Sequence, residues 1–197
     1  MIAAFNPEDR AKGLQSLNFQ DDTLPQERAL GLNWNQETDK LQIAAKTKDA
    51  VFTKRGLLSY ICTLYDPLGI VCPYILIAKA LFQQVCRRKA EWDDVLTEEE
   101  AKVFKRWLSV LESAKNISIE RPLPSSTGSR MELHHFCDAS TQAYAAVSYL
   151  RIITNEKVHV SFLFGKSRLA PIKKVTIPRL ELTSAVLATK QDQMLKK

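Results

Sequence analysis

The 197-residue chain is 45% hydrophobic and 25% charged, which is typical of a globular protein with one or two domains. No apolar run approaches the about 20 residues that a membrane-spanning helix needs, and the first residues lack the basic and long apolar regions of a secretory signal peptide. We therefore expect an intracellular protein with no membrane partner.

Four cysteines are scattered along the chain without any C-x-x-C pair, at Cys62, Cys72, Cys86 and Cys137. Zinc sites usually take their ligands as closely spaced pairs, so this spacing argues against a zinc site. We expect reduced thiols, as is usual in the cytosol.

The net charge of +6 is concentrated near the C-terminus. Between Val160 and Lys197 there are eight basic residues and two acidic ones, so the rest of the chain sums to zero. Clustered positive charge favours a polyanionic partner such as nucleic acid. A basic, solvated face without such a partner is the alternative interpretation.

Residues 1–50 predict irregular structure followed by a β-hairpin. Leu30, Leu32 and Trp34 alternate with glycine and asparagine, turn-forming residues follow, and the alternation resumes at Leu41 and Ile43. A two-stranded unit of this size is too small to be stable alone.

Residues 51–120 predict three helices. The first begins at Thr53 and ends at the turn sequence DPLG (66–69), where proline fixes one backbone angle and glycine permits left-handed ones. The second begins at Pro73, runs to about Ala90 and has its apolar positions at Ile77, Ala80, Leu81 and Val85.

The third helix has the clearest start signal. Thr97 and Glu100 have the spacing of a capping box, in which each side chain satisfies a free amide at the helix end. One apolar stripe follows, formed by Val103, Phe104, Trp107, Leu108 and Leu111.

Residues 121–130 have the composition of a linker, and we place the main domain boundary there. Residues 131–197 predict three strands, at 131–137, 143–150 and 157–164, because β-branched and aromatic residues dominate these runs. A final helix begins near Pro178, with one side carrying Leu182, Ala185, Val186 and Thr189. The expected fold class is mixed α/β.

Two carboxylates are candidates for metal binding. Asp138 directly follows the first of these strands, and Glu181 lies in the first turn of the final helix. A helix packed across the sheet could bring them together to hold Mg²⁺. From spacing alone this signal is weak, and a turn-forming aspartate and a glutamate favoured by the helix dipole are the preferred explanation of the two residues.

Seven short motifs, taken in order, resemble signatures of the BEL/Pao retrotransposon pol polyprotein. Each would be weak alone, but the ordered set is specific and covers the chain from about residue 25 to its end. The motifs are ALGLNWN (29–35), TKRGLLS (53–59), YDPLGIVCP (65–73), FCDAS (136–140), AYAA (143–146), KSRLAP (166–171) and IPRLEL (177–182).

The resemblance implies a role for each segment. Residues 1–50 would be the end of the reverse transcriptase palm, 51–120 a thumb- or connection-like helical segment, and 131–197 the N-terminal half of a retroviral-type RNase H domain. Asp138 and Glu181 would be catalytic acids that share two Mg²⁺ ions. The basic residues of this half would lie near the backbone of an RNA–DNA hybrid; they are Lys166, Arg168, Lys173, Lys174 and Arg179.

Two departures from the family pattern limit this expectation. RNase H enzymes need a further aspartate on a fourth strand, whereas this chain ends at Lys197 within the final helix, and Asp192 is on that same helix. The Tyr-x-Asp-Asp motif of the polymerase is absent from the sequence. We therefore expect an incomplete metal site and a chain that is inactive alone.

The functional expectation is a pol polyprotein fragment that acts with the remainder of that polyprotein, in the cytoplasm, a virus-like particle or the nucleus. The full-length protein would bind RNA–DNA hybrid and cleave its RNA strand. The alternative is a non-catalytic nucleic-acid-binding or interaction remnant of a decayed element.

Overall fold

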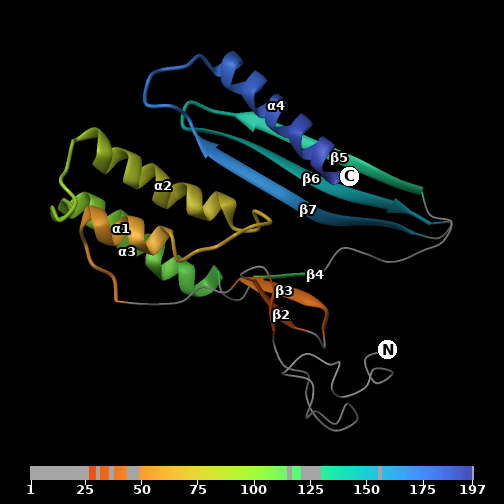
Figure 1. Ribbon diagram of the computed structural model, residues 1–197, viewed down its shortest axis with the longest axis horizontal. Coiled ribbons are helices and arrows are strands. Elements are labelled where there is room, and N and C mark those ends of the chain that lie inside the picture. The colour runs from red at the N-terminus through yellow and green to blue at the C-terminus, as the bar shows by residue number, and fades with distance from the viewer. Residues whose placement is uncertain are drawn as a thin grey trace, which may run out of the picture.

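The computed structural model describes residues 27–29, 32–35, 38–43, 49–114, 117–120, 130–154 and 157–196. These residues form a mixed α/β fold with two antiparallel sheets and four helices (Figure 1), which confirms the expected fold class. The elements are β1 (Glu27–Ala29), β2 (Leu32–Asn35), β3 (Lys40–Ile43), α1 (Lys54–Ile61), α2 (Cys72–Arg87), α3 (Glu98–Ala114), β4 (Ser118–Glu120), β5 (Arg130–Ala139), β6 (Ala143–Ile153), β7 (Val158–Leu169) and α4 (Ile177–Leu195).

The first sheet has the order β1-β2-β3-β4. Its centre is the hairpin that the sequence predicts, with Trp34 opposite Leu41, and the Trp34 indole N–H donates to Asp39 Oδ1 at 2.9 Å. Leu30 lies outside the described residues. The short outer strands β1 and β4 were not predicted, and β4 reaches β3 from beyond the three helices.

The three helices share one apolar core with the hairpin. Leu57, Val85 and Phe104 are completely buried in it. Trp107 and Tyr74 stack with ring centroids 5.1 Å apart, and the Trp107 indole N–H donates to the Tyr74 carbonyl at 3.0 Å. The Tyr74 hydroxyl donates in return to the Trp107 carbonyl, so α2 and α3 are joined by polar and aromatic contacts together.

The predicted face of α4 is wrong, and the predicted faces of α2 and α3 are each wrong in part. In α2, Ile77 is 53% exposed and Ala80 is also exposed, and the core positions are Ile75, Ala78, Leu81 and Val85. Val103 of α3 is likewise exposed. In α4 the predicted side points outward, and the buried positions are Leu180, Ser184, Leu187, Ala188 and Gln191. The buried side of α4 contains polar residues because each has a hydrogen-bond partner. Gln191 bonds to Ser148 and Ala146 of the sheet, and the Ser184 hydroxyl donates to the Glu181 carbonyl of its own helix.

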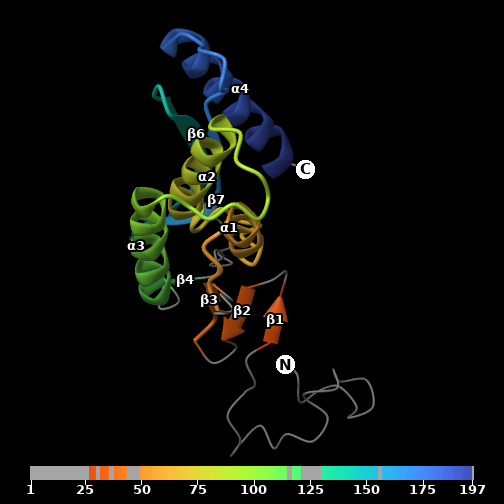
Figure 2. The same cartoon turned by 90° about the vertical axis from the view of Figure 1, so that its left-hand side faces the viewer.

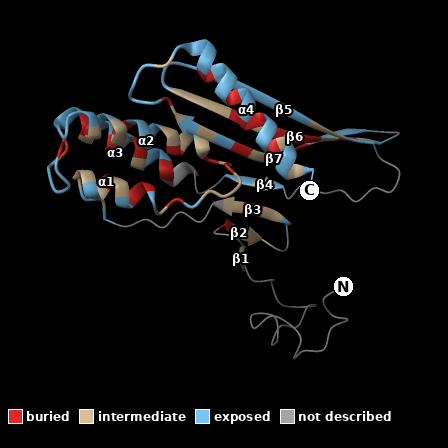
Figure 3. Cartoon of the chain, turned by 45° about the horizontal axis from the view of Figure 1, so that its top comes forward, coloured by how far each residue is buried: buried red, intermediate tan, exposed pale blue. Residues whose placement is uncertain are grey.

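The second sheet has the order β5-β6-β7, with all three strands longer than predicted and one irregularity in the β6–β7 register at Ser148/Tyr149. α4 packs on β5 and β6, and α2 lies on the other side of the sheet, next to β7 (Figure 2). Buried residues therefore line both the helical core and the underside of α4 (Figure 3). Of the predicted linker, only Arg130 is described, as the first residue of β5. The four-segment division stays a prediction.

Within the described residues, no helix is both long enough and apolar enough to cross a bilayer. All four cysteines are free, which agrees with the expected thiols.

The loop before α2 meets the sheet through glycine backbones. Gly69 has φ +78, and a Cβ there would overlap the Gly165 carbonyl oxygen. The Gly165 N–H donates to the Leu68 carbonyl at 2.8 Å. Asp66 holds the loop in shape, because its two carboxylate oxygens accept the N–H groups of Ile70 and Val71 at 2.8 and 2.9 Å.

A buried ion pair organises the start of α3. Glu100 is 4% exposed and accepts two hydrogen bonds from Arg88, at 3.0 and 3.1 Å. It also accepts the Thr97 N–H at 2.9 Å, and its own N–H donates to Thr97 Oγ1 at 3.3 Å, which confirms the capping box. Burial alone would raise the pKa of Glu100, but the hydrogen bonds from Arg88 and Thr97 outweigh burial and lower that pKa.

Replacing Gly69 by alanine should lower the free energy of unfolding by more than about 2 kcal/mol, because it adds both backbone strain and a steric clash. Gly165→Ala adds only a tight contact, with its Cβ 3.0 Å from Gly69 O, and should cost clearly less. Urea unfolding of both variants beside the wild type makes the comparison. A Gly69→Ala variant as stable as the wild type would contradict the close contact.

Acid should weaken the helical core through Glu100. Its pKa is lower in the folded than in the unfolded chain, so its stabilising contribution is complete above the unfolded pKa and is lost as pH falls through the folded pKa. Glu100→Gln should cost about 1–3 kcal/mol at neutral pH and flatten the acid limb of the stability curve. Urea unfolding across the acid range measures both effects. Exposed Glu99 supplies the control, since Glu99→Gln should change neither; equal curves for the two variants would refute the assignment.

Candidate functional site

Charged residues of several elements gather at one end of the second sheet. β5 and β7 are both antiparallel to β6, so these two strands end on the same side. The loop after β7 leads from that end into α4 (Figure 1). This geometry brings Asp138, the predicted basic residues and the start of α4 to one end of the sheet.

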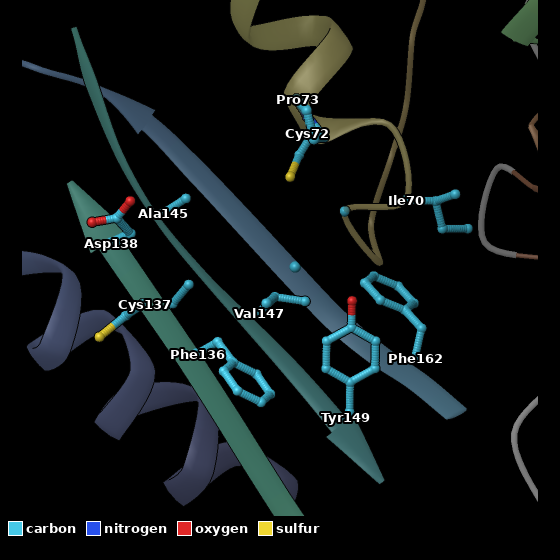
Figure 4. Close-up of a pocket in the computed structure, with 13 residues that line it drawn as sticks. Ile70, Cys72, Pro73, Phe136, Cys137, Asp138, Ala145, Val147, Tyr149 and Phe162 are labelled. Carbon is cyan, nitrogen blue, oxygen red and sulfur yellow. The ribbon is translucent and has the colours of Figure 1, made fainter. Parts of the chain in front are cut away.

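Asp138 lies near the end of β5 and its side chain is exposed. Its Oδ1 accepts the N–H of Ala139 at 2.8 Å. It lines a cavity of about 480 Å³ with Phe136, Tyr149 and the start of α2 around Cys72 (Figure 4). The carboxylate thus stands at the rim of a mostly apolar hollow, open to solvent.

Glu181 is the fifth residue of α4, and it is exposed. The helix begins at Ile177, after the N-cap residue Thr176, and therefore starts one residue earlier than the sequence predicts. Glu181 consequently falls in the second turn of the helix, and the expectation that it lies in the first turn is wrong.

The two carboxylates lie at the same end of the sheet, but Asp138 faces away from α4. His135 pairs with Ser148 on the face that α4 covers. Asp138 follows three residues later and points to the opposite face with its partner Ala145, because side chains alternate along a strand. The structure therefore packs α4 against β5 without bringing the Asp138 and Glu181 carboxylates into contact.

The positions of Asp138 along β5 and of Glu181 along α4 can be related through one contact between these elements. His135 Nε2 lies 3.0 Å from Asp192 Oδ1, and β5 and α4 run in opposite directions (Figure 1). From that contact Asp138 is about 10 Å along β5, and Glu181 is about 16 Å along α4 toward the same end.

The donor chemistry of this end suits a hard cation. Carboxylate oxygens are the ligands that Mg²⁺ prefers, and Mg²⁺ is often held by one or two carboxylates together with substrate phosphates. Asp138 and Glu181 fit this requirement in kind. Within the part of the chain that the structure describes, no group of three or more acidic, histidine or cysteine side chains is close enough to hold a metal, so no complete protein cage is formed there.

All five predicted basic residues are exposed: Lys166 and Arg168 in β7, Lys173 and Lys174 in the following loop, and Arg179 in α4. None of them forms an ion pair with another described residue. Their charge is therefore not cancelled by an ion-pair partner in the described structure.

A hydrogen-bonded chain between the sheet and α4 was not predicted from the sequence. His135 Nδ1 lies 2.8 Å from Ser148 Oγ, Ser148 donates to Gln191 Oε1 at 2.8 Å, and Gln191 Nε2 donates to the Ala146 carbonyl at 3.3 Å. Ser148 thus uses its hydrogen on Gln191 and accepts from His135, while Asp192 accepts from the other ring nitrogen.

This chain is structural rather than nucleophilic. Ser148 is completely buried, so it has no access to a substrate. Asp192 also bonds to Lys196 of its own helix. The hydrogen bond from Lys196 lowers the pKa of Asp192, and the hydrogen bond from His135 lowers it further, while burial acts in the opposite direction. A hairpin register predicted for β5 and β6 from the short loop between them would have placed His135 opposite Ser148.

Comparison with known proteins identifies the family to which the chain belongs. No protein in a search of curated proteins matches the chain. A family model described as "Pao retrotransposon-like RNaseH-like domain" matches residues 53–197, from the N-cap of α1 through the sheet and α4 to the last residue, and so covers well over half of the chain. The BEL/Pao resemblance of the motifs is thereby confirmed: the chain belongs to the Pao retrotransposon-like RNaseH-like domain family.

Proposed function

We propose that this chain forms part of the RNase H site of a retrotransposon pol polyprotein, which holds an RNA–DNA hybrid and hydrolyses its RNA strand. Its RNase H-like role in a retrotransposon follows from the family. One observation supports the finer proposal: exposed carboxylates and uncancelled cations lie at the same end of the second sheet.

Asp138 and Glu181 would hold the metal, and the basic residues of β7, the loop and α4 would bind phosphates of the hybrid. Two-metal sites activate the attacking water and stabilise the leaving oxygen of a phosphodiester. The protein's own contribution is to present the scissile phosphate at this end of the sheet. Lys173 and Lys174 would act as point charges, and the Arg168 and Arg179 guanidinium groups could each bind a phosphate through two hydrogen bonds.

Other parts of the polyprotein would complete the site. A further carboxylate would be needed, because the described residues contain no group of three or more possible metal ligands. In the same proposal, residues 1–50 derive from the end of the reverse transcriptase palm and residues 51–120 from its thumb or connection, as the order of the motifs implies.

Asp138→Asn and Glu181→Gln should each abolish Mg²⁺-dependent cleavage in a pol polyprotein that contains this chain. Loss of an outer-shell partner of a metal costs about 10- to 100-fold in activity, and loss of a direct ligand should exceed that. Hybrid binding should be kept, since neither carboxylate contacts phosphates directly. The measurement is cleavage of the labelled RNA strand of a hybrid, beside filter binding of the same hybrid.

The matched control is Glu91→Gln, which removes an exposed carboxylate from the helical segment and should cleave at the wild-type rate. Cleavage retained by Asp138→Asn would show that this aspartate is no metal ligand. Hybrid binding without any cleavage by the wild-type polyprotein would favour the non-catalytic remnant instead.

A further inference from the structure

α4 meets the second sheet through a small apolar contact and a polar one. The apolar contact is a cluster of three buried residues, Ala146 of β6 with Leu187 and Ala188 of α4. Hydrophobic contact is non-directional, so such a cluster tolerates more than one height of the helix along the strands. The apolar cluster alone therefore does not specify a single position of α4 on the sheet.

Three hydrogen bonds supply the direction that the apolar cluster lacks. His135 Nε2 lies 3.0 Å from Asp192 Oδ1. Gln191 accepts from the Ser148 hydroxyl at 2.8 Å and donates to the Ala146 carbonyl at 3.3 Å. The bonds come from two strands and end on two consecutive helical residues, whose side chains point about 100° apart around the helix axis. Together they define both the height and the rotation of α4.

A shift of α4 by one turn would break this arrangement. The residues four positions before and after Gln191 are Leu187 and Leu195, and neither can accept a hydrogen bond from the Ser148 hydroxyl. Ser148 is completely buried, so water cannot replace the lost bond, and an unmade hydrogen bond away from water is costly. The neighbouring registers of the helix are therefore disfavoured.

We propose that this hydrogen-bonded chain holds α4 in one register on the sheet and thereby sets where Glu181 stands relative to Asp138. His135 lies three residues before Asp138 on β5, and Asp192 lies eleven residues after Glu181 on α4. A slip of the helix by one turn would carry Glu181 along the sheet by about 5.4 Å. The members of the chain are thus positioning residues, and the inference rests on the proposed function because it concerns the same two carboxylates.

Spin labels at two exposed positions measure this register directly. Met131 of β5 and Leu182 of α4 are 63% and 68% exposed, and they can be labelled in a full chain whose four cysteines are replaced by serine. Pulsed electron paramagnetic resonance then reports the distance between β5 and α4. The unaltered contacts should give one narrow distance distribution. Gln191→Leu should broaden it or displace it by up to about 5 Å, the length of one helical turn.

The apolar variant His135→Leu/Ser148→Ala/Gln191→Leu separates positioning from stability. Replacing both partners of a buried hydrogen bond by apolar groups recovers much of the stability that removal of one partner costs. This variant should therefore unfold at a higher urea concentration than Gln191→Leu. Its register should stay unfixed, because all three hydrogen bonds are gone. A distance distribution as narrow as that of the unaltered chain would overturn the proposal.

In a pol polyprotein that contains this chain, the apolar variant should lower kcat for hybrid cleavage by about 10- to 100-fold. The half-saturating Mg²⁺ concentration should rise, because misplaced carboxylates hold the metal less well. KM for the hybrid should stay the same, since four of the five predicted phosphate-binding cations lie outside α4. The matched control is Tyr74→Phe, which removes a hydrogen bond between α2 and α3 and should leave the distance, kcat and Mg²⁺ dependence unchanged.

The positioning role and the proposed function fail in different ways. Cleavage that Asp138→Asn abolishes but that the apolar variant performs with unchanged kcat and Mg²⁺ dependence would overturn the positioning role and leave the proposed function standing. No cleavage by the wild-type polyprotein would refute the proposed function, and with it the positioning of its carboxylates.

Discussion

The close approach of two glycine backbones determines how the helical part of the molecule sits on the second sheet. A side chain at Gly69 would overlap the Gly165 carbonyl, and the left-handed φ of Gly69 suits glycine above other residues. Because neither residue has a Cβ, the Leu68 carbonyl can accept the Gly165 N–H from the edge of β7. The bonds from Ser167 and Gln83 then continue the contact along α2.

This arrangement covers the two faces of the second sheet with different elements. α4 closes one face through Leu187 and Ala188 and through the polar chain from His135 to Asp192. The helical segment covers part of the other face, and its loop forms a wall of the hollow that Asp138 rims. The family match also runs through both parts without interruption, from residue 53 to residue 197. The helices are therefore integral to the surface that carries the candidate site.

Local sequence rules predicted those features that short-range chemistry determines. The Thr97–Glu100 capping box and the hairpin around Trp34 are each specified within a few residues, and the structure contains both. The first helix was expected to run to the DPLG sequence, but α1 ends earlier, at Ile61. The retrotransposon family could be identified because seven motifs occur in order, although composition alone left nucleic acid as one of two interpretations.

Features that depend on distant partners could not be predicted in this way. The buried side of α4 includes Gln191, which looks like a solvent-facing residue until Ala146 and Ser148 are placed opposite it. The short strand β4 pairs only because β3 leaves an edge free. The same limit applies to Asp138 and Glu181. Their positions in the sequence do not show that Asp138 lies on the face of the sheet opposite the helix that carries Glu181.

Amide hydrogen exchange at Gly165 is the most direct test of this account, because that N–H leaves the sheet to bond the Leu68 carbonyl. An outward-facing amide on an edge strand exchanges rapidly unless another element covers it. If the helical segment is docked as described, the Gly165 amide should be strongly protected in the native chain, at a level close to the amides paired between β6 and β7. Exchange at Gly165 at the rate of an unstructured peptide, with the β6–β7 amides still protected, would contradict the docking and with it the single surface built from helices and sheet.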